Sequence, residues 1–264
     1  MRVIYLLVLP LALSGCDGFG VKSIRDICAQ SPQMCEDLNQ DAWCLAEKSK
    51  IIRNRYALAQ QASDQQTYEL MVNFENYRKC ISPASKIEYI KDRDKETSRK
   101  QGLITAENEL KRLTLETENS SHPQLLYYHW SRFNHKSALD KLLSLEQQGE
   151  LENPQMQVAM ASYYIKRDLN KATNALLHAL SLYPADAEVD VDIFRGLSAI
   201  YLKTEDFPNA YIWAYVGREF KLDNLDLAQI ETLLLKRNVK LAPLKEKAED
   251  YVQAIEDGNF SAQL

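Results

Sequence analysis

The second half of the chain repeats itself at an interval of 34 residues, and this spacing restricts the possible folds more than any other feature. In each copy a ring-bearing residue is followed by an alanine and then by a leucine. The two sets are His129, Ala138 and Leu142, followed by Tyr163, Ala172 and Leu176. A repeat of this length predicts pairs of helices stacked one after another, because a single pair cannot bury its own apolar face.

The middle copy resembles the tetratricopeptide repeat in its order of aromatic, small, large, small and proline. The matching residues are Tyr163, Ala172, Leu176, Ala179 and Pro184. A third copy follows with Tyr201 and Ala210, after an insertion of about four residues near 186–190. The resemblance implies an all-α fold in which residues 119–222 form a TPR-like α-solenoid of helical hairpins. Sel1-like repeats look similar, and an irregular helical bundle with a chance spacing is the alternative.

Composition agrees with an all-helical chain. Only eight glycines and eight prolines are present in 264 residues, which is few for a protein made of short strands and turns. Apolar residues make up 45%, enough for a packed core. Residues 223–264 are expected to form capping helices at about 224–237 and 243–257. The net charge of −5, without a basic stripe, argues against nucleic-acid binding.

The N-terminus has the pattern of an export signal. Arg2 is followed by an apolar run over 3–13, which is too short to cross a bilayer. The sequence Leu13-Ser14-Gly15-Cys16 then resembles a bacterial lipobox. This resemblance implies a signal peptide over 1–15, cleavage before Cys16, lipid on that thiol and membrane anchoring through a tether over 16–22. An ordinary secretory signal with a chance cysteine is the alternative.

Asp17 bears on which membrane holds the chain. An aspartate after the lipidated cysteine resembles the inner-membrane retention signal of enteric-type lipoproteins. We therefore expect a lipid-anchored protein that faces the periplasm, with the inner membrane favoured over the outer one. The alternative is that Asp17 only begins a polar tether.

Four cysteines remain in the predicted N-terminal helical region, 23–118, and an even number in an exported chain suggests two disulfides. One helix is predicted over 41–62, with Asp41 able to cap it, and another from about 65 to 80, capped by Ser63. If these helices form a hairpin, Cys44 and Cys80 lie at nearly the same level, because they are 19 and 17 residues from Ser63. The predicted pairs are Cys44–Cys80 and, by remainder, Cys28–Cys35. Metal binding is the weaker alternative, since no CxxC pair or nearby histidine supports it.

The polar stretch 91–101 is interpreted as the solvated face and turns of a long helix. Gly102, directly after it, is expected to bend or interrupt that helix.

No catalytic, metal-binding or cofactor-binding constellation is recognised in the sequence. The four histidines lack ligand spacing, and no nucleophile or phosphate-loop motif is found. His129 is interpreted as a hydrogen-bonded core residue. The carboxylates of Asp186, Glu188, Asp190 and Asp192 suit a solvated insertion, although two of them could act as acid and base on a glycan. An envelope enzyme acting on peptidoglycan therefore stays open as an alternative.

The favoured function is the binding of a protein or peptide partner in the cell envelope, as an adaptor or assembly scaffold. By the register of the resembled repeat, a groove lined by the first helix of each unit is implied. Its candidate residues are Tyr127, Trp130, Gln157, Tyr164, Arg195 and Lys203. Packing between neighbouring helices is the alternative role for these side chains. A purely structural subunit, with its groove filled by its own C-terminal helix, is a third possibility.

The chain as a whole resembles an uncharacterised family of bacterial lipoproteins known only as a domain of unknown function. That resemblance implies no particular activity.

Overall fold

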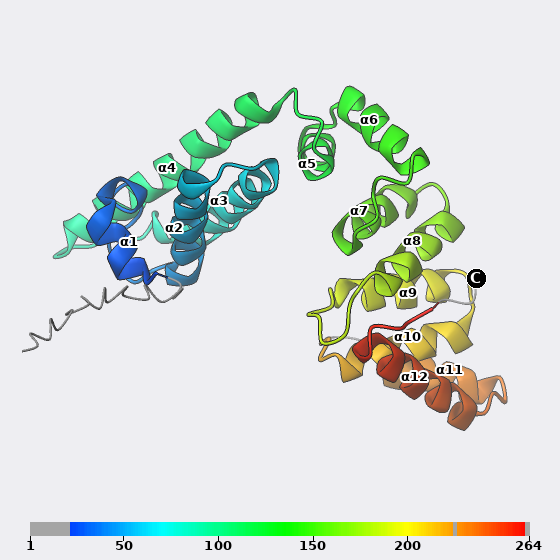
Figure 1. The fold of residues 1–264 in the computed structure, drawn as a ribbon. Helices are drawn as coiled ribbons and strands as arrows, with labels where there is room; N and C mark the ends of the chain where they lie inside the picture. Colours follow the sequence, from blue (N-terminus) through cyan, green and yellow to red (C-terminus); the bar gives the residue numbers. More distant parts are fainter. Residues whose placement is uncertain (1–21, 224–225, 262–264) are drawn as a thin grey trace, which may run out of the picture. The chain divides into compact units, whose positions relative to one another are not determined.

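The structure is a computed structural model that describes residues 22–223 and 226–261. Within those ranges every regular element is helical, which confirms the predicted all-α class. The chain divides into two compact units, 1–116 and 117–264 (Figure 1). Cys16 and Asp17, the predicted lipidation and sorting residues, lie outside the described residues. No helix of the described part is long and apolar enough to cross a bilayer.

The first unit is built around a hairpin of two long helices. Its elements are α1 (Ile24–Gln30), the short 3-10 turn η1 (Pro32–Met34), α2 (Leu45–Gln60), α3 (Asp64–Ala84) and α4 (Arg93–Thr117), whose last residue belongs to the second unit. Ser63 begins α3 as predicted, because its Oγ accepts a hydrogen bond from the Gln66 N–H at 3.2 Å. Large side chains from both helices fill the space beside the hairpin, and Phe74 and Tyr77 of α3 are fully buried.

Both predicted disulfides are present. Cys44 and Cys80 join the start of α2 to the last part of α3, with Cα atoms 5.9 Å apart. Cys28 and Cys35 close the small loop between α1 and the residue after η1, with Cα atoms 5.7 Å apart. These separations are the usual ones for bridged cysteines. The nearly equal distance of Cys44 and Cys80 from the turn of the hairpin was therefore enough to choose among the three possible ways of pairing four cysteines.

Gly102 does not interrupt its helix, since α4 continues through it. Gly102 instead lies where Tyr77 packs onto α4. A Cβ atom at this position would lie 2.3 Å from the Tyr77 Oη and 3.1 Å from the Asn39 backbone nitrogen. Glycine is needed here because two other segments approach the helix backbone too closely for a side chain.

In the described residues of the second unit, three helical hairpins are followed by two helices that pack mainly on α10. The hairpins are α5 (Pro123–Phe133) with α6 (Lys136–Gln147), α7 (Pro154–Tyr164) with α8 (Leu169–Ser181), and α9 (Asp192–Lys203) with α10 (Phe207–Glu219), and the two helices that follow are α11 (Leu227–Lys236) and α12 (Leu241–Glu256). Side-chain caps begin four of these helices: Asn153, Asp168, Asp206 and Asp226 each accept a hydrogen bond from a main-chain N–H three residues on. The predicted C-terminal helices correspond to α11 and α12.

The core of the second unit is richest around α10, where every residue from 210 to 217 is buried. Trp213 stacks on Phe194 of α9 at 6.3 Å between ring centroids and meets Tyr251 of α12 at 5.3 Å. Phe260, after α12, also packs on Trp213 at 5.9 Å. The last described residues are thus fixed to α10 by aromatic contacts.

Candidate functional site

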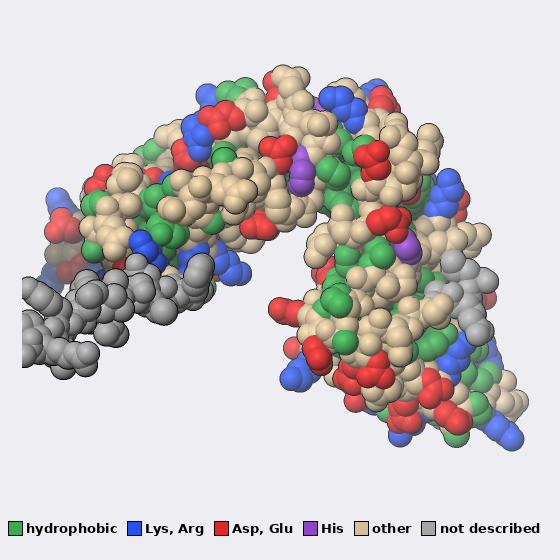
Figure 2. Space-filling view, viewed as in Figure 1, with side chains coloured by type: hydrophobic (Ala, Val, Ile, Leu, Met, Phe, Trp, Pro, Cys, Tyr) green, Lys and Arg blue, Asp and Glu red, His purple; other side chains and the backbone are tan. Residues whose placement is uncertain are grey.

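An open hollow in the second unit lies among α6, α7 and α8 and has a volume of about 730 Å³. This volume falls in the range of small-ligand and peptide pockets. Residues of α6 and α8, the second helices of the first two hairpins, form most of its wall. Figure 2 shows hydrophobic side chains gathered on this face, with acidic and histidine side chains between them. The wall includes Leu143, Glu146, Gln147, Gln157, Tyr163, Tyr164, Lys171, Asn174, Ala175, Leu177, His178, Ser181 and Ser261.

Tyr164, at the end of α7, organises one side of the hollow. Its hydroxyl donates a hydrogen bond to the Glu146 carboxylate at 2.6 Å, and the Lys171 Nζ lies 5.2 Å from the centre of its ring. Burial and the bond to Glu146 raise the pKa of Tyr164 well above its usual value of 10.0. Tyr164 therefore stays neutral and keeps donating its proton, which fixes the position of the Glu146 carboxylate.

Tyr163 continues the aromatic surface away from Tyr164. The two rings meet at 5.0 Å, and Trp130 of α5 contacts Tyr163 edge-on at 5.4 Å. Tyr127 lies beside Trp130 at 5.8 Å, and its hydroxyl is 3.3 Å from the Ser162 Oγ. Both Tyr127 and Trp130 are partly buried. They pack between α5 and α7 and do not border the hollow.

The remaining predicted groove residues are distributed differently. Gln157 borders the hollow, but it is 8% exposed and its side-chain amide donates to the Leu151 carbonyl oxygen at 3.0 Å. Arg195 is exposed on α9 and pairs with Asp192 one turn earlier. Lys203 is exposed at the end of α9. Of the six predicted residues, the structure thus places Gln157 and Tyr164 at the hollow.

His178 and Ser181 of α8 form a polar group at the other side of the hollow. The His178 Nε2 lies 2.7 Å from a Glu152 carboxylate oxygen, and its Nδ1 lies 3.3 Å from the Ser181 Oγ. The Ser181 hydroxyl donates its single proton to the His178 carbonyl oxygen at 2.8 Å, so that proton does not point at the imidazole. A serine held in this way is not poised as a nucleophile, and we interpret the group as a polar rim.

His129 is buried, as predicted, at 2% exposure on α5. Its Nε2 lies 2.9 Å from the Thr117 Oγ1, whereas its buried Nδ1 has no hydrogen-bond partner among the described residues. The ring stacks on His135 at 5.5 Å. Burial, and then the nearby His135, lower the pKa of His129 below 6.5. The prediction of a core histidine is confirmed, but only one of its two nitrogens is paired.

The four carboxylates considered for acid–base chemistry, Asp186, Glu188, Asp190 and Asp192, are all exposed. Val189 between them is buried and holds the insertion against the second unit.

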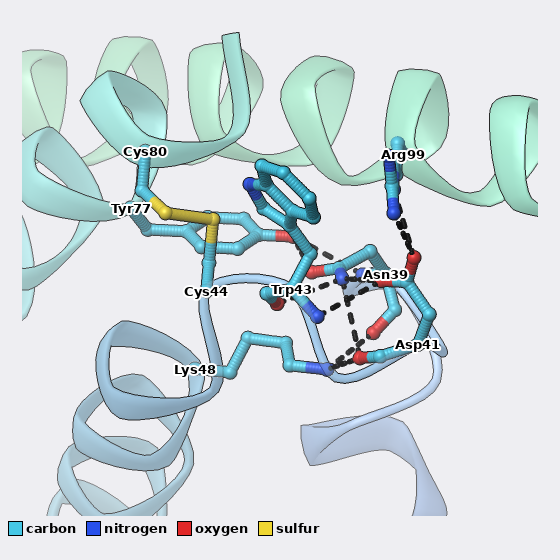
Figure 3. Close-up of a disulfide and its surroundings, with 8 residues drawn as sticks. All are labelled: Asn39, Asp41, Trp43, Cys44, Lys48, Tyr77, Cys80 and Arg99. Atoms are coloured by element: carbon cyan, nitrogen blue, oxygen red, sulfur yellow. Dashed lines mark hydrogen bonds and ion pairs between the residues drawn. A yellow bond between two sulfur atoms is a disulfide. The ribbon is translucent and has the colours of Figure 1, made fainter. Parts of the chain in front are cut away.

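The first unit contains a buried ionic group that the sequence did not reveal (Figure 3). Arg99 of α4 is 4% exposed and forms an ion pair with Asp41 at 2.6 Å. The guanidinium also lies over the rings of Trp43, at 4.5 Å, and Tyr89, at 5.2 Å. The interpretation of 91–101 as entirely solvated is therefore wrong at Arg99, where two aromatic rings and an aspartate from outside the helix supply the contacts.

The same group shapes the loop before α2. The Lys48 Nζ donates to the main-chain oxygens of Asn39 and Asp41, at 2.7 and 2.5 Å. The Tyr77 hydroxyl donates to the Asn39 side chain at 2.8 Å, and burial raises the pKa of Tyr77 to about 12. The prediction that Asp41 caps a helix starting there is wrong: α2 begins at Leu45, and Asp41 bonds Arg99 and the Trp43 N–H instead. These polar atoms satisfy one another, which indicates a structural role.

Among the described residues, Cys44, Glu47 and Cys80 are grouped closely enough to suggest a metal site. Both thiols are consumed in the Cys44–Cys80 disulfide, so no thiolate is available as a ligand.

Fold and site together define an all-helical protein with a disulfide-braced first unit and a second unit of helical hairpins that carries an open hollow. The chain belongs to a family described as a protein of unknown function, DUF2989, whose model matches residues 13–215 and so reaches from the predicted signal peptide into α10. No curated protein and no solved structure matches the chain.

Proposed function

We propose that this protein is a lipid-anchored adaptor or assembly scaffold that binds a protein or peptide partner in the bacterial cell envelope. Lipid on Cys16 would hold it at the periplasmic face of a membrane, and Asp17 favours the inner membrane. The observation that carries the proposed binding role is the 730 Å³ hollow among α6, α7 and α8. Its wall combines aromatic, aliphatic and amide side chains, which are the groups that recognise polypeptide.

We further propose that the hairpins are tetratricopeptide-like repeats. The alanines at the corresponding positions, Ala138, Ala172 and Ala210, each lie in the second helix of successive hairpins. Their exposed fractions are 7%, 0% and 0%. Small buried residues at equivalent places support a repeating unit, because they let the paired helices approach closely.

The two disulfides support a location outside the cytoplasm. Cystine bridges persist in oxidising compartments such as the bacterial periplasm, and in the cytosol they are usually reduced. Cys28–Cys35 and Cys44–Cys80 are both formed in the structure.

Site-specific crosslinking in intact cells tests the binding role. A photoreactive phenylalanine analogue replaces Leu177 in the wall of the hollow, and a matched control replaces Leu235, which is 59% exposed on α11 and outside the hollow. We expect a discrete adduct from position 177, lost when Asn174→Glu is added, and none from position 235. Identical adduct patterns from both positions, or none from position 177, would rule out the hollow as the binding surface.

Mass spectrometry of the mature N-terminus tests the anchor independently. We expect an acylated Cys16 as the first residue. Membrane fractionation of the wild type and Asp17→Ser then tests sorting, with the variant moving to the outer membrane. A mature start elsewhere, or an unmodified thiol, contradicts the lipid anchor; retention of both proteins in the outer membrane contradicts the role of Asp17.

A further inference from the structure

The hollow among α6, α7 and α8 has a wall that is specific enough to indicate the chemistry of its partner. We propose that it binds an extended, uncharged peptide segment of a partner protein, with apolar residues at alternating positions. This inference rests on the binding role proposed above and adds the class of ligand.

The shape of the wall favours an extended chain. Lys171, Asn174, His178 and Ser181 recur at helical spacing on α8 and all border the hollow. From first to last they span about 15 Å of helix at 1.5 Å per residue. An extended peptide rises about 3.3 Å per residue, so four to five residues match this length.

The charges of the wall favour an uncharged ligand. The wall holds one acid, Glu146, and one lysine, Lys171, so its formal charges sum to zero, and both side chains engage Tyr164. The His178 Nε2 lies 2.7 Å from a Glu152 carboxylate oxygen, so that carboxylate already has a partner at the rim. A charged side chain entering this space would lose water without gaining an unmatched opposite charge.

The uncommitted polar groups suit a peptide main chain. Gln147 on α6 and Asn174 on α8 are exposed side chains at the border of the hollow. Each amide offers both donors and an acceptor, which is what a main-chain N–H and C=O require. Leu143 and Leu177 provide apolar contacts between them. Because successive side chains of an extended chain point to opposite sides, every second residue would face these leucines.

The chain itself brings a non-helical segment to this place. Phe260 is fixed against Trp213 and Tyr251, at 5.9 and 5.4 Å, and Ser261, which belongs to no helix, then borders the hollow. A non-helical segment is thus already accommodated at one edge.

Fluorescence anisotropy with detergent-solubilised full chain tests the inference. The probe is a labelled, end-blocked heptapeptide that alternates valine or leucine with serine or asparagine. A first comparison peptide has the same residues with the apolar ones grouped in one block. A second keeps the alternating order but has two apolar residues replaced by glutamate. We expect saturable binding of the alternating peptide and binding weaker by about fivefold or more for each of the other two, because the first loses the alternating apolar contacts and the second loses charge neutrality.

Two protein variants locate the binding. Asn174→Glu puts a charge at the centre of the α8 stripe and is expected to weaken binding about tenfold, a charge-burial effect. Asn170→Glu makes the same change on an exposed α8 residue outside the hollow and should leave binding unchanged.

Several results would overturn the inference: no binding by any peptide, equal binding of the glutamate peptide, or no effect of Asn174→Glu. Binding that occurs only after removal of residues 262–264 would assign the hollow to the protein's own end. If position 177 still crosslinks to a partner in cells while the peptides fail, the proposed binding role stands and only the ligand chemistry is wrong.

Discussion

The two units solve the same problem, burial of helices in a small domain, with different interactions. The first unit carries both disulfides and a buried ionic group centred on Arg99 and Asp41. The second unit has no disulfide among its described residues and instead packs an aromatic core around Trp213. Covalent and ionic ties compensate for a modest core. The comparison suggests that the two units will respond differently to reduction, acid and core mutation.

The largest expected effect concerns the aromatic core. Trp213→Ala should cost the second unit about 3 to 5 kcal/mol, because a fully packed ring leaves a cavity behind. Trp43→Ala in the first unit should cost only about 1 kcal/mol, since Trp43 is 44% exposed and chiefly covers Arg99. Hydrogen exchange followed by mass spectrometry resolves the two units. Equal losses in both would mean that the units do not unfold separately.

Next in size is the disulfide across the hairpin of α2 and α3. Replacing Cys44 and Cys80 with alanine should destabilise the first unit by about 3 to 4 kcal/mol, because the bridge closes a loop with a sequence separation of 36. The same change at Cys28 and Cys35, with a separation of 7, should cost less. Denaturant melts of the variants measure both. The idea is refuted if the shorter loop matters more, or if the second unit weakens as well.

One glycine in each unit allows a matched test of how tightly the helices pack. Gly102→Ala should cost about 1 to 3 kcal/mol, because its new Cβ meets Tyr77 in a fixed position. Gly196→Ala in α9 meets only the tip of Leu176, at 3.0 Å, and gains helix propensity, so its effect should be within about 1 kcal/mol. Thermal unfolding gives both values. A neutral Gly102→Ala would show that Tyr77 can move.

The smallest expected effect is a difference in acid sensitivity. Because the pKa of His129 is lowered in the folded protein, the unfolded chain binds a proton at this residue at a higher pH than the folded one does. The second unit therefore loses stability as the pH falls below about 6.5. Burial alone would raise the pKa of Asp41, but bonds from Arg99, Asn39 and the Trp43 N–H lower it below 3.8. The stability that the ionised Asp41 gives to the first unit is therefore lost only as the pH falls below about 3.8.

Unfolding of the wild type and of His129→Gln at several pH values measures the effect. We expect His129→Gln to flatten the dependence between pH 6.5 and 5. The same slope in the variant and the wild type would remove His129 as its cause.

The sequence could predict those features that follow from helical spacing. Cys44 and Cys80 were paired because helical rise places them level across a hairpin, and Asn153 followed from its cap chemistry. Arg99 was missed because its run of charged neighbours hides one inward-facing member. Its partners Asp41, Trp43 and Tyr89 are on other segments, although Trp43 and Tyr89 at the ends of helical stretches were a possible signal.

The groove expected from the sequence and the observed hollow share only Gln157 and Tyr164. Repeat register assigned the binding role to first helices, whereas the space lies mainly beside the second helices α6 and α8. The face on which the hollow forms depends on the angle between neighbouring hairpins. Tyr163 and Tyr164 contribute to this angle, because they contact residues of α5, α6 and α8. The spacing of residues within one helix does not predict the angle between two hairpins.

The order of the two bridges has a mechanical consequence. A pull applied at Lys22 would pass along α1 to Cys28, across sulfur to Cys35, along the loop to Cys44, and across sulfur again to Cys80. Residues 29–34 and 45–79 would carry no tension, so the hairpin of α2 and α3 could not be unzipped from its N-terminal side. The two bridges together shield these helices from a force applied at the N-terminal end of the described chain.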